Sequence, residues 1–229
     1  MSISPILPNM IHAPPIITPI LATPFGVISL PQAAAINAEL SDLATRRIAA
    51  SPAPGSNSLH LRSKDDLFEW QEQSAVVLRT AVLQGVYSIV GAINDMSEPQ
   101  LRALSLEARA WLNILHTEGS VPATTYPLSA WCAIYCVAAP PASDTRSDSG
   151  VLRFYESRLG TMFQDASNAS LRFPFKAAHY SWRPVPGEMA VFPASLLHEI
   201  ALLRVPGQLI WATARIRFVA AGQQGIGRW

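Results

Sequence analysis

Three residues of this chain have types and spacing that could bind a metal ion. His116 and Glu118 stand two positions apart, so on a strand both side chains would lie on one face. Such a pair, combined with a remote histidine, forms the three-ligand set that binds Fe(II) and leaves coordination positions open. His198 could be the remote ligand. A pair of this type also occurs by chance, and His198 could be an ordinary core histidine, so the residues alone leave both interpretations open.

Two arginines follow His198 on a segment that is typical of a strand. Arg215 and Arg217 alternate with apolar residues in the stretch "WATARIRFVA", so both would point to the same side. That side is either solvated or lines a polar cavity. In a cavity, a guanidinium group could hold a carboxylate through two parallel hydrogen bonds.

Composition sets limits on the class of protein. The chain has 229 residues, of which 49% are hydrophobic and 14% charged, so a sizeable core can be buried. The formal net charge is +1 without a basic cluster, which argues against a nucleic-acid partner. We see no uninterrupted apolar run long enough to span a bilayer, and the N-terminus lacks the basic segment of a signal peptide. Cys132 and Cys136 are expected to be buried free thiols, which favours a cytoplasmic location.

The chain divides into a helical and a β-rich part. Helical spacing runs through Ile36, Leu40, Leu43 and Ile48, and a second long helix is expected after Ser63 as its N-cap. Residues 15–22 indicate an edge strand. From about residue 107, short β-rich runs are separated by polar loops. We therefore expect one α+β domain over 1–229, with helical support in 1–106 and a β-sandwich or barrel in 107–220.

The order of motifs resembles a bacterial family of 2-oxoglutarate- and Fe(II)-dependent oxygenases, whose double-stranded β-helix (a jelly-roll or cupin-like fold) follows a helical section. The resemblance covers nearly the whole chain. Segments that carry it are "SNSLHLRSKDDLFEW", "LSAWCAIYCVAAP", "DSGVLRFYESR" and "PVPGEMAVFPASLLHEI". The last is the most specific, and it implies that His198 occupies the distal iron-ligand position.

The sequence departs from the family at the other ligands. The family's proximal His-x-His or His-x-Asp pair falls at Thr124 and Tyr126. A relocated triad of His116, Glu118 and His198 is one way to restore the site. The family's 2-oxoglutarate-binding arginine falls at Gln208, so Arg215 is the preferred replacement. Arg217 and Arg204 are alternatives.

Two functions therefore stay open at this point. The resemblance implies a 2-oxoglutarate-dependent dioxygenase with Fe(II) and 2-oxoglutarate as cofactors and a small-molecule substrate. The alternative is an altered or metal-free homologue that binds a small acid on the same fold, with Arg215, Arg217 and Tyr126 as the cofactor- or acid-binding residues. Neither function involves nucleic acid or a membrane, and the oligomeric state is open.

Overall fold

Two antiparallel β-sheets form the centre of the molecule. The computed structural model describes residues 22–31, 33–142, 145, 147–155, 174 and 179–220. The edge strand expected at 15–22 lies, except for Ala22, outside these residues. The first described strand is β1 (Gly26–Ser29) instead.

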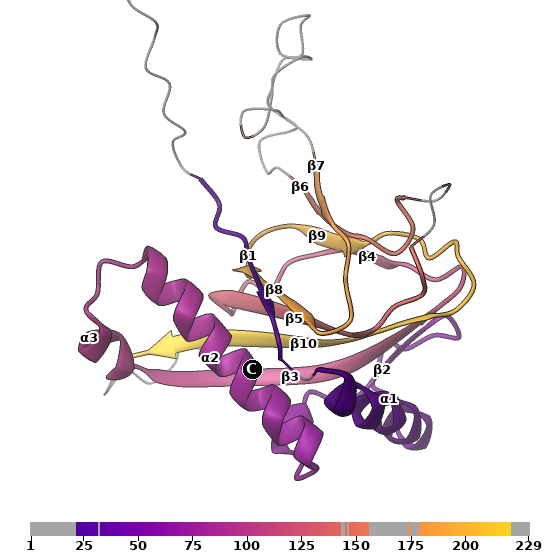
Figure 1. The fold of residues 1–229 in the computed structure, drawn as a ribbon, viewed down its shortest axis with the longest axis horizontal. Coiled ribbons are helices and arrows are strands. Elements are labelled where there is room, and N and C mark those ends of the chain that lie inside the picture. Colours follow the sequence, from indigo (N-terminus) through magenta and orange to yellow (C-terminus); the bar gives the residue numbers. More distant parts are fainter. Residues whose placement is uncertain are drawn as a thin grey trace, which may run out of the picture.

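The large sheet has six strands in the order β1-β8-β5-β10-β3-β2, and the small sheet has four in the order β4-β9-β6-β7. The remaining strands of the large sheet are β2 (His60–Arg62), β3 (Ser105–His116), β5 (Trp131–Ala138), β8 (Glu188–Pro193) and β10 (Gln208–Val219). The small sheet contains β4 (Val121–Thr124), β6 (Leu152–Tyr155), β7 (His179–Trp182) and β9 (His198–Ile200). Figure 1 shows the small sheet stacked over the large one. This arrangement confirms the expected double-stranded β-helix.

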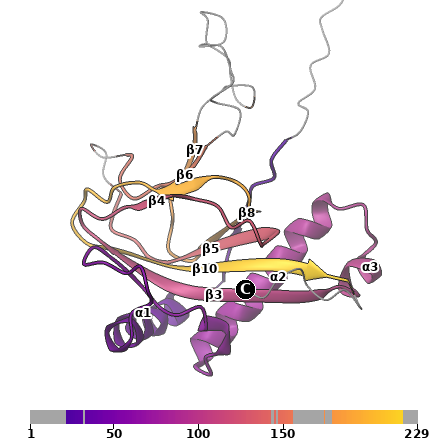
Figure 2. The same cartoon turned by 180° about the vertical axis from the view of Figure 1, so that it is seen from behind.

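The helices cover the outer face of the large sheet. Helix α1 (Ala33–Ala50) and helix α2 (Gln73–Ile93) cross this face, and the short α3 (Glu98–Arg102) leads into β3. Figures 1 and 2 show both long helices on the side of the sheet away from β4, β9 and β6. The Tyr135 hydroxyl of β5 donates to Asn37 Oδ1 of α1 at 2.7 Å, which ties helix to sheet.

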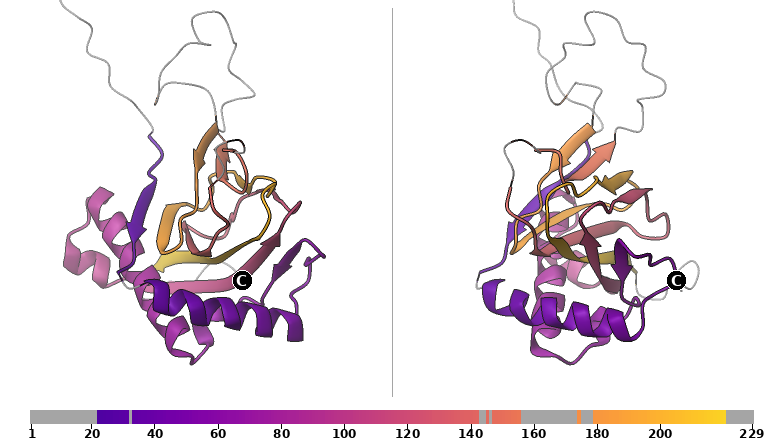
Figure 3. Two further views of the ribbon diagram at one scale, coloured as in Figure 1. Left: turned by 45° about the vertical axis from the view of Figure 1, so that its right-hand side comes forward. Right: turned by 90° about the vertical axis from the view of Figure 1, so that its right-hand side faces the viewer.

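Alternation along the central strands separates two cores. Even-numbered residues of β3 and β10, such as Leu112 and Ala212, pack toward the helices. Odd-numbered residues, such as Leu115, Leu209 and Trp211, pack between the two sheets. Figure 3 shows the helices and the two sheets from two further sides. Because Arg215 and Arg217 are odd-numbered, they lie on the inner side, and the expectation that they share a face is confirmed.

Helix α2 differs from its expected form. It begins at Gln73, after a 3₁₀ turn at Leu67–Glu69, and it runs without a break to Ile93. Ser63 is therefore not its N-cap; its hydroxyl donates to the Lys64 carbonyl and accepts from the Leu112 amide. By length and composition α2 could cross a membrane, contrary to our expectation, although its buried side chains pack in the core shared with the sheet.

Candidate functional site

His198 lies at the start of β9, inside the β-helix. The turn after β8 is closed by a hydrogen bond from the Leu196 amide to the Pro193 carbonyl, and it brings His198 between β4 and β6. The imidazole is 4% exposed and contacts the rings of Phe192 and Phe154, at centroid distances of 5.0 and 6.1 Å. Burial lowers the pKa of His198, so the ring is neutral at pH 7.

The hydrogen bonds of His198 fix its tautomer. Nδ1 lies 2.8 Å from the Leu196 carbonyl oxygen, which can only accept, so Nδ1 carries the proton. Nε2 therefore keeps its lone pair. Among the described residues, Nε2 has no hydrogen-bond partner. His198 thus presents one nitrogen that could bind a metal ion or accept a hydrogen bond.

Thr124 and Tyr126 occupy the places opposite His198. Thr124 is its direct partner in the β4–β9 pairing, and the Tyr126 ring lies 5.5 Å from the imidazole. A hydrogen bond from the Tyr126 amide to the Ala194 carbonyl holds this loop against the end of β8. Thr124 and Tyr126 therefore lie beside His198, where the resemblance implies the proximal ligand positions.

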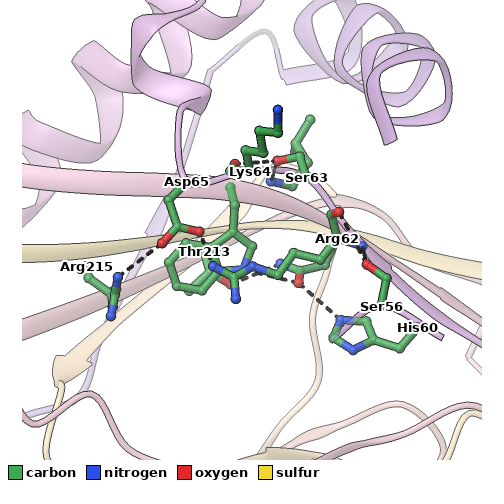
Figure 4. Close-up of polar contacts among 11 residues, drawn as sticks. Ser56, His60, Arg62, Ser63, Lys64, Asp65, Thr213 and Arg215 are labelled. Carbon is green, nitrogen blue, oxygen red and sulfur yellow. Dashed lines mark hydrogen bonds and ion pairs between the residues drawn. The ribbon is translucent and has the colours of Figure 1, made fainter. Parts of the chain in front are cut away.

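An arginine–aspartate cluster lies beside Tyr126. Asp65 forms ion pairs with Arg62 through Oδ1 and with Arg215 through Oδ2, the latter at 3.2 Å. Figure 4 shows the Asp65 carboxylate between the two guanidinium groups. Arg62 lies 4.1 Å from the centroid of the Trp111 ring and Arg215 lies 5.4 Å from that of Tyr126. The Asp65 carboxylate thus bridges the two guanidinium groups.

Local structure explains how these groups meet. Arg62 ends β2 and pairs in register with Asn113 of β3, which places its side chain above the inner face of the sheet. The turn at Ser63 then brings Asp65 back over β3. Arg215 lies two residues beyond Thr213 on β10, so both side chains project to the inner face of the sheet, where Arg62 and Asp65 also lie.

A buried polar network lies deeper between the sheets. Asn113 is 2% exposed, and its Oδ1 accepts hydrogen bonds from Trp111 Nε1 at 3.2 Å and from His60 Nε2 at 3.1 Å. Its Nδ2 donates to Thr213 Oγ1, which also accepts from Trp211 Nε1. Each polar group here has a partner, so this network holds the two tryptophans, and with them the arginine cluster, in fixed positions.

His116 lies at the opposite end of β10 from Arg215, and the described residues do not form the relocated triad of His116, Glu118 and His198. His116 pairs with Gln208, seven residues from Arg215 along β10. At about 3.3 Å per residue, Gln208 and its partner His116 are therefore roughly 23 Å along the strand from Arg215. Glu118 is exposed, has a left-handed backbone (φ 68°) and donates its amide to the Leu203 carbonyl. Within the described residues, no group of three His, Cys, Asp or Glu side chains could hold a metal ion.

The remaining candidates are also placed. Arg217 has its Nε 2.6 Å from Glu107 Oε2 on β3, outside the arginine–aspartate cluster. Gln208, at the family's anion-binding position, is exposed and contacts His116. Arg204 pairs with Asp148 at the surface. Among the predicted arginines, Arg215 contacts Tyr126, the residue beside His198.

The residues present do not fit the iron site that the resemblance implies. His198 supplies one suitable nitrogen. Thr124 offers only a neutral hydroxyl, which is a weak ligand for Fe(II). Burial raises the pKa of the Tyr126 phenol well above its usual range, which disfavours the phenolate form that would bind iron.

Two surface cavities are lined by residues other than His198. One, of about 280 Å³, is bordered mainly by apolar residues, among them Pro140, Pro184 and Leu203. Another, of about 230 Å³, is lined by the Arg153–Glu199 and Arg204–Asp148 ion pairs. Neither includes His198, Asp65 or Arg215, whose chemistry makes them the stronger candidate site.

Comparisons with known proteins define the fold. No family model matches the sequence, and no curated protein matches it. Solved structures do match. A Pseudomonas putida prolyl-4-hydroxylase aligns with a TM-score of 0.55 at 13% identity, covering 86% of this chain and 93% of that one. A 2OG-Fe(II) oxygenase-family oxidoreductase from Burkholderia pseudomallei gives 0.53 at 11% identity, covering 83% and 84%.

A third similar structure is the non-heme alpha-ketoglutarate-dependent carbocyclase SnoK from nogalamycin biosynthesis. It has a TM-score of 0.55 at 10% identity, covering 86% of this chain and 79% of that one. The chain therefore has the fold of 2-oxoglutarate- and Fe(II)-dependent oxygenases, and identities this low establish the fold alone.

Sequence reasoning missed Arg62, Asp65 and Trp111. The stretch "HLRSKDD" does place two acidic residues soon after an arginine. That signal became meaningful only once β2 was seen to pair with β3, which sets Arg62 and Asp65 next to Arg215.

Proposed function

We propose that this protein binds a small organic acid at the arginine–aspartate cluster, on a fold shared with 2-oxoglutarate-dependent oxygenases. The observation that carries the proposal is the sharing of one carboxylate, that of Asp65, by Arg62 and Arg215. Arg62 shares this counter-ion and has hydrogen-bond donors left for a second carboxylate.

The unsatisfied atoms of the cluster support this proposal. Arg62 Nε is buried and has no hydrogen-bond partner among the described residues. A buried donor without a partner costs free energy that a bound acid would recover. Trp111 and Tyr126 supply flat apolar surfaces beside the guanidinium groups, against which the carbon chain of an acid could pack.

His198 has a place in the same proposal. Its Nε2 lone pair can accept a hydrogen bond from a hydroxyl of the bound molecule. The free thiols of Cys132 and Cys136 are buried, and they are the basis on which we place this function in the cytoplasm. The oxidation of a small molecule, as in the structures that this chain resembles, is the alternative. It would need two further iron ligands beyond His198.

Calorimetric titration with glutarate, in buffer containing EDTA, tests the proposal. We expect saturable binding by the wild type. For Arg215→Gln we expect affinity at least about tenfold lower, because one charge-assisted hydrogen bond contributes roughly 1.5–3 kcal/mol. Arg102→Gln is the matched control, since Arg102 is exposed on α3, where it pairs with Glu98.

Asp65→Asn separates a binding role from a structural one. If the cluster binds acids, removing the competing carboxylate strengthens glutarate binding, because Arg62 and Arg215 then lose the counter-ion that they share. If the ion pairs serve only to hold the fold, the variant loses stability and gains no affinity. Absence of glutarate binding by the wild type would overturn the proposal.

A further inference from the structure

The cavity of about 230 Å³ lies on the outer face of the small sheet and is bordered by two ion pairs. Arg153 of β6 and Glu199 of β9 are direct partners in this sheet, and their side chains pair at 2.6 Å. Leu152 and Phe154, which flank Arg153, point into the core between the sheets. Because side chains alternate along a strand, the two charged side chains project from the opposite face. The cavity therefore lies on the other side of the small sheet from the His198 imidazole.

The second ion pair is held in place by a buried serine. Arg204 Nη1 lies 3.0 Å from Asp148 Oδ2, and both residues line the cavity. Ser149 is 2% exposed, and its hydroxyl accepts a hydrogen bond from the Arg204 amide at 2.9 Å. The Ser149 carbonyl accepts another from Arg183 Nη1 at 3.1 Å. These bonds join the loop before β6 to the segment after β9, so Asp148 and Arg204 are held at the edge of the cavity.

The Arg153–Glu199 pair leaves hydrogen-bonding capacity for a ligand. The printed bond joins Arg153 Nη1 to Glu199 Oε1. Arg153 Nε is buried and has no hydrogen-bond partner among the described residues, and such a donor costs free energy that a bound acceptor recovers. An ionised carboxylate has about four acceptor positions, so Glu199 can accept further bonds. A hydrogen bond with Tyr155 raises the pKa of Arg153, which keeps the guanidinium group charged.

The size of the cavity limits the ligand to a small molecule. At about 30 Å³ for each water, the volume corresponds to about seven water molecules. Pockets for drug-sized ligands are larger, at roughly 300–1,000 Å³. Val121 and Pro122 add an apolar wall beside the charged groups. The cavity therefore suits a ligand of roughly seven non-hydrogen atoms with charged groups and a short apolar part.

We propose that this cavity binds a small zwitterion of the amino-acid class, with one ammonium and one carboxylate group. The ligand carboxylate contacts Arg153 and its ammonium group contacts Glu199, so the ligand dipole lies antiparallel to that of the ion pair. Each charge then faces its opposite, whereas a simple anion would also face Glu199 and a simple cation would also face Arg153. The site is separate from the arginine–aspartate cluster, and the inference does not rest on the proposed function.

Calorimetric titrations with L-alanine, propionate and ethylamine test this inference, because propionate and ethylamine each lack one charged group of alanine. For the wild type we expect alanine to bind about tenfold or more tightly than either. Glu199→Gln should remove the preference for alanine over propionate. Arg153→Gln should remove the preference for alanine over ethylamine. Arg102→Gln, on the exposed α3, is the control and should keep both preferences.

A purely structural ion pair predicts a different result. In that case the wild type does not prefer alanine, and both variants only lower the unfolding temperature, which would overturn the inference. Arg215→Gln identifies the site that alanine occupies. Unchanged alanine affinity in this variant supports the cavity, whereas its loss would place alanine at the arginine–aspartate cluster and also overturn the inference.

The wild type alone provides a second measurement if the Arg153 and Glu199 variants do not fold. Addition of alanine to isotope-labelled protein should shift the backbone amide signals of residues that line the cavity, among them Ser120, Glu199 and Ala201. No shifts, or shifts confined to residues outside the cavity, would refute the zwitterion site.

Discussion

Asn113 connects the deep network to the site above it. Its side-chain oxygen accepts from both His60 and Trp111, and Trp111 lies next to the two arginines of the cluster. An apolar residue of similar size cannot accept these bonds, so two buried donors would be left without partners.

We therefore expect Asn113→Leu to lower the free energy of unfolding by about 2–4 kcal/mol, since each buried unsatisfied group costs roughly 1–3 kcal/mol. Urea denaturation followed by circular dichroism measures this change. Thr80→Val, on the exposed face of α2, is the control and should change stability by less than about 0.5 kcal/mol. A loss in Asn113→Leu no larger than in the control would show that the network does not stabilise the fold.

His60 makes stability depend on pH. Burial lowers the pKa of His60 below 6.5, the Asn113 hydrogen bond raises it in part, and the Arg62 charge lowers it further. Between the lowered pKa and 6.5 the unfolded chain binds more protons than the folded one. The contribution of His60 to stability is therefore complete above pH 6.5 and falls as the pH drops toward the folded-state pKa.

His60→Gln isolates this effect, because glutamine can still donate to Asn113 and does not titrate. Denaturant midpoints measured from pH 8 to pH 5 should fall less steeply for His60→Gln than for the wild type. Equal slopes for the two proteins would mean that His60 does not titrate differently in the folded and unfolded states.

Among the elements, α2 shows how one residue type can have two roles. A Cβ at Gly85 would overlap Met189 Cε and lie 2.9 Å from Ile28 Cδ1, so glycine permits the close approach of helix and sheet. At Gly91 the nearest atom, Leu101 Cδ2, would lie 3.6 Å away, which is an ordinary contact.

Alanine at these two positions should thus have different effects. Gly91→Ala should raise stability by up to about 1 kcal/mol, because alanine favours the helix. Gly85→Ala should be less stable than Gly91→Ala by about 1–3 kcal/mol, the usual cost of overpacking. Thermal and urea denaturation of both variants provides the comparison. Equal stabilisation by the two changes would indicate that α2 does not press on β1 and β8.

Sequence patterns predicted elements better than their positions in space. Alternation in "ATARIRF" correctly put Arg215 and Arg217 on one face, and the "FP" motif put His198 in the β-helix. The spacing of His116 and Glu118 predicted that they share one face of a strand. It did not predict at which end of the sheet they lie. The pairing of Gln208 with His116 sets that end, and no local pattern reports it.

At the scale of the whole molecule, the fold matches that of oxygenases, whereas the site lacks two of the iron ligands that this likeness implies. The two sheets and their helices match solved oxygenase structures over most of the chain. Of the ligand positions implied by that likeness, only His198 keeps a residue suited to Fe(II), because Thr124 and Tyr126, whose phenolate form is disfavoured by burial, occupy the others. The arginine cluster is built from β2, the turn after it and β10, and it depends on their meeting in the folded protein.

The most direct test of this account is an anaerobic calorimetric titration of the wild-type protein with 2-oxoglutarate, once in EDTA and once with Fe(II) present. We predict that this dianionic acid binds with the same affinity in both conditions and that Arg215→Gln weakens it in both. Binding that requires Fe(II) and is lost in His198→Ala would contradict the account and support the alternative function, an oxygenase.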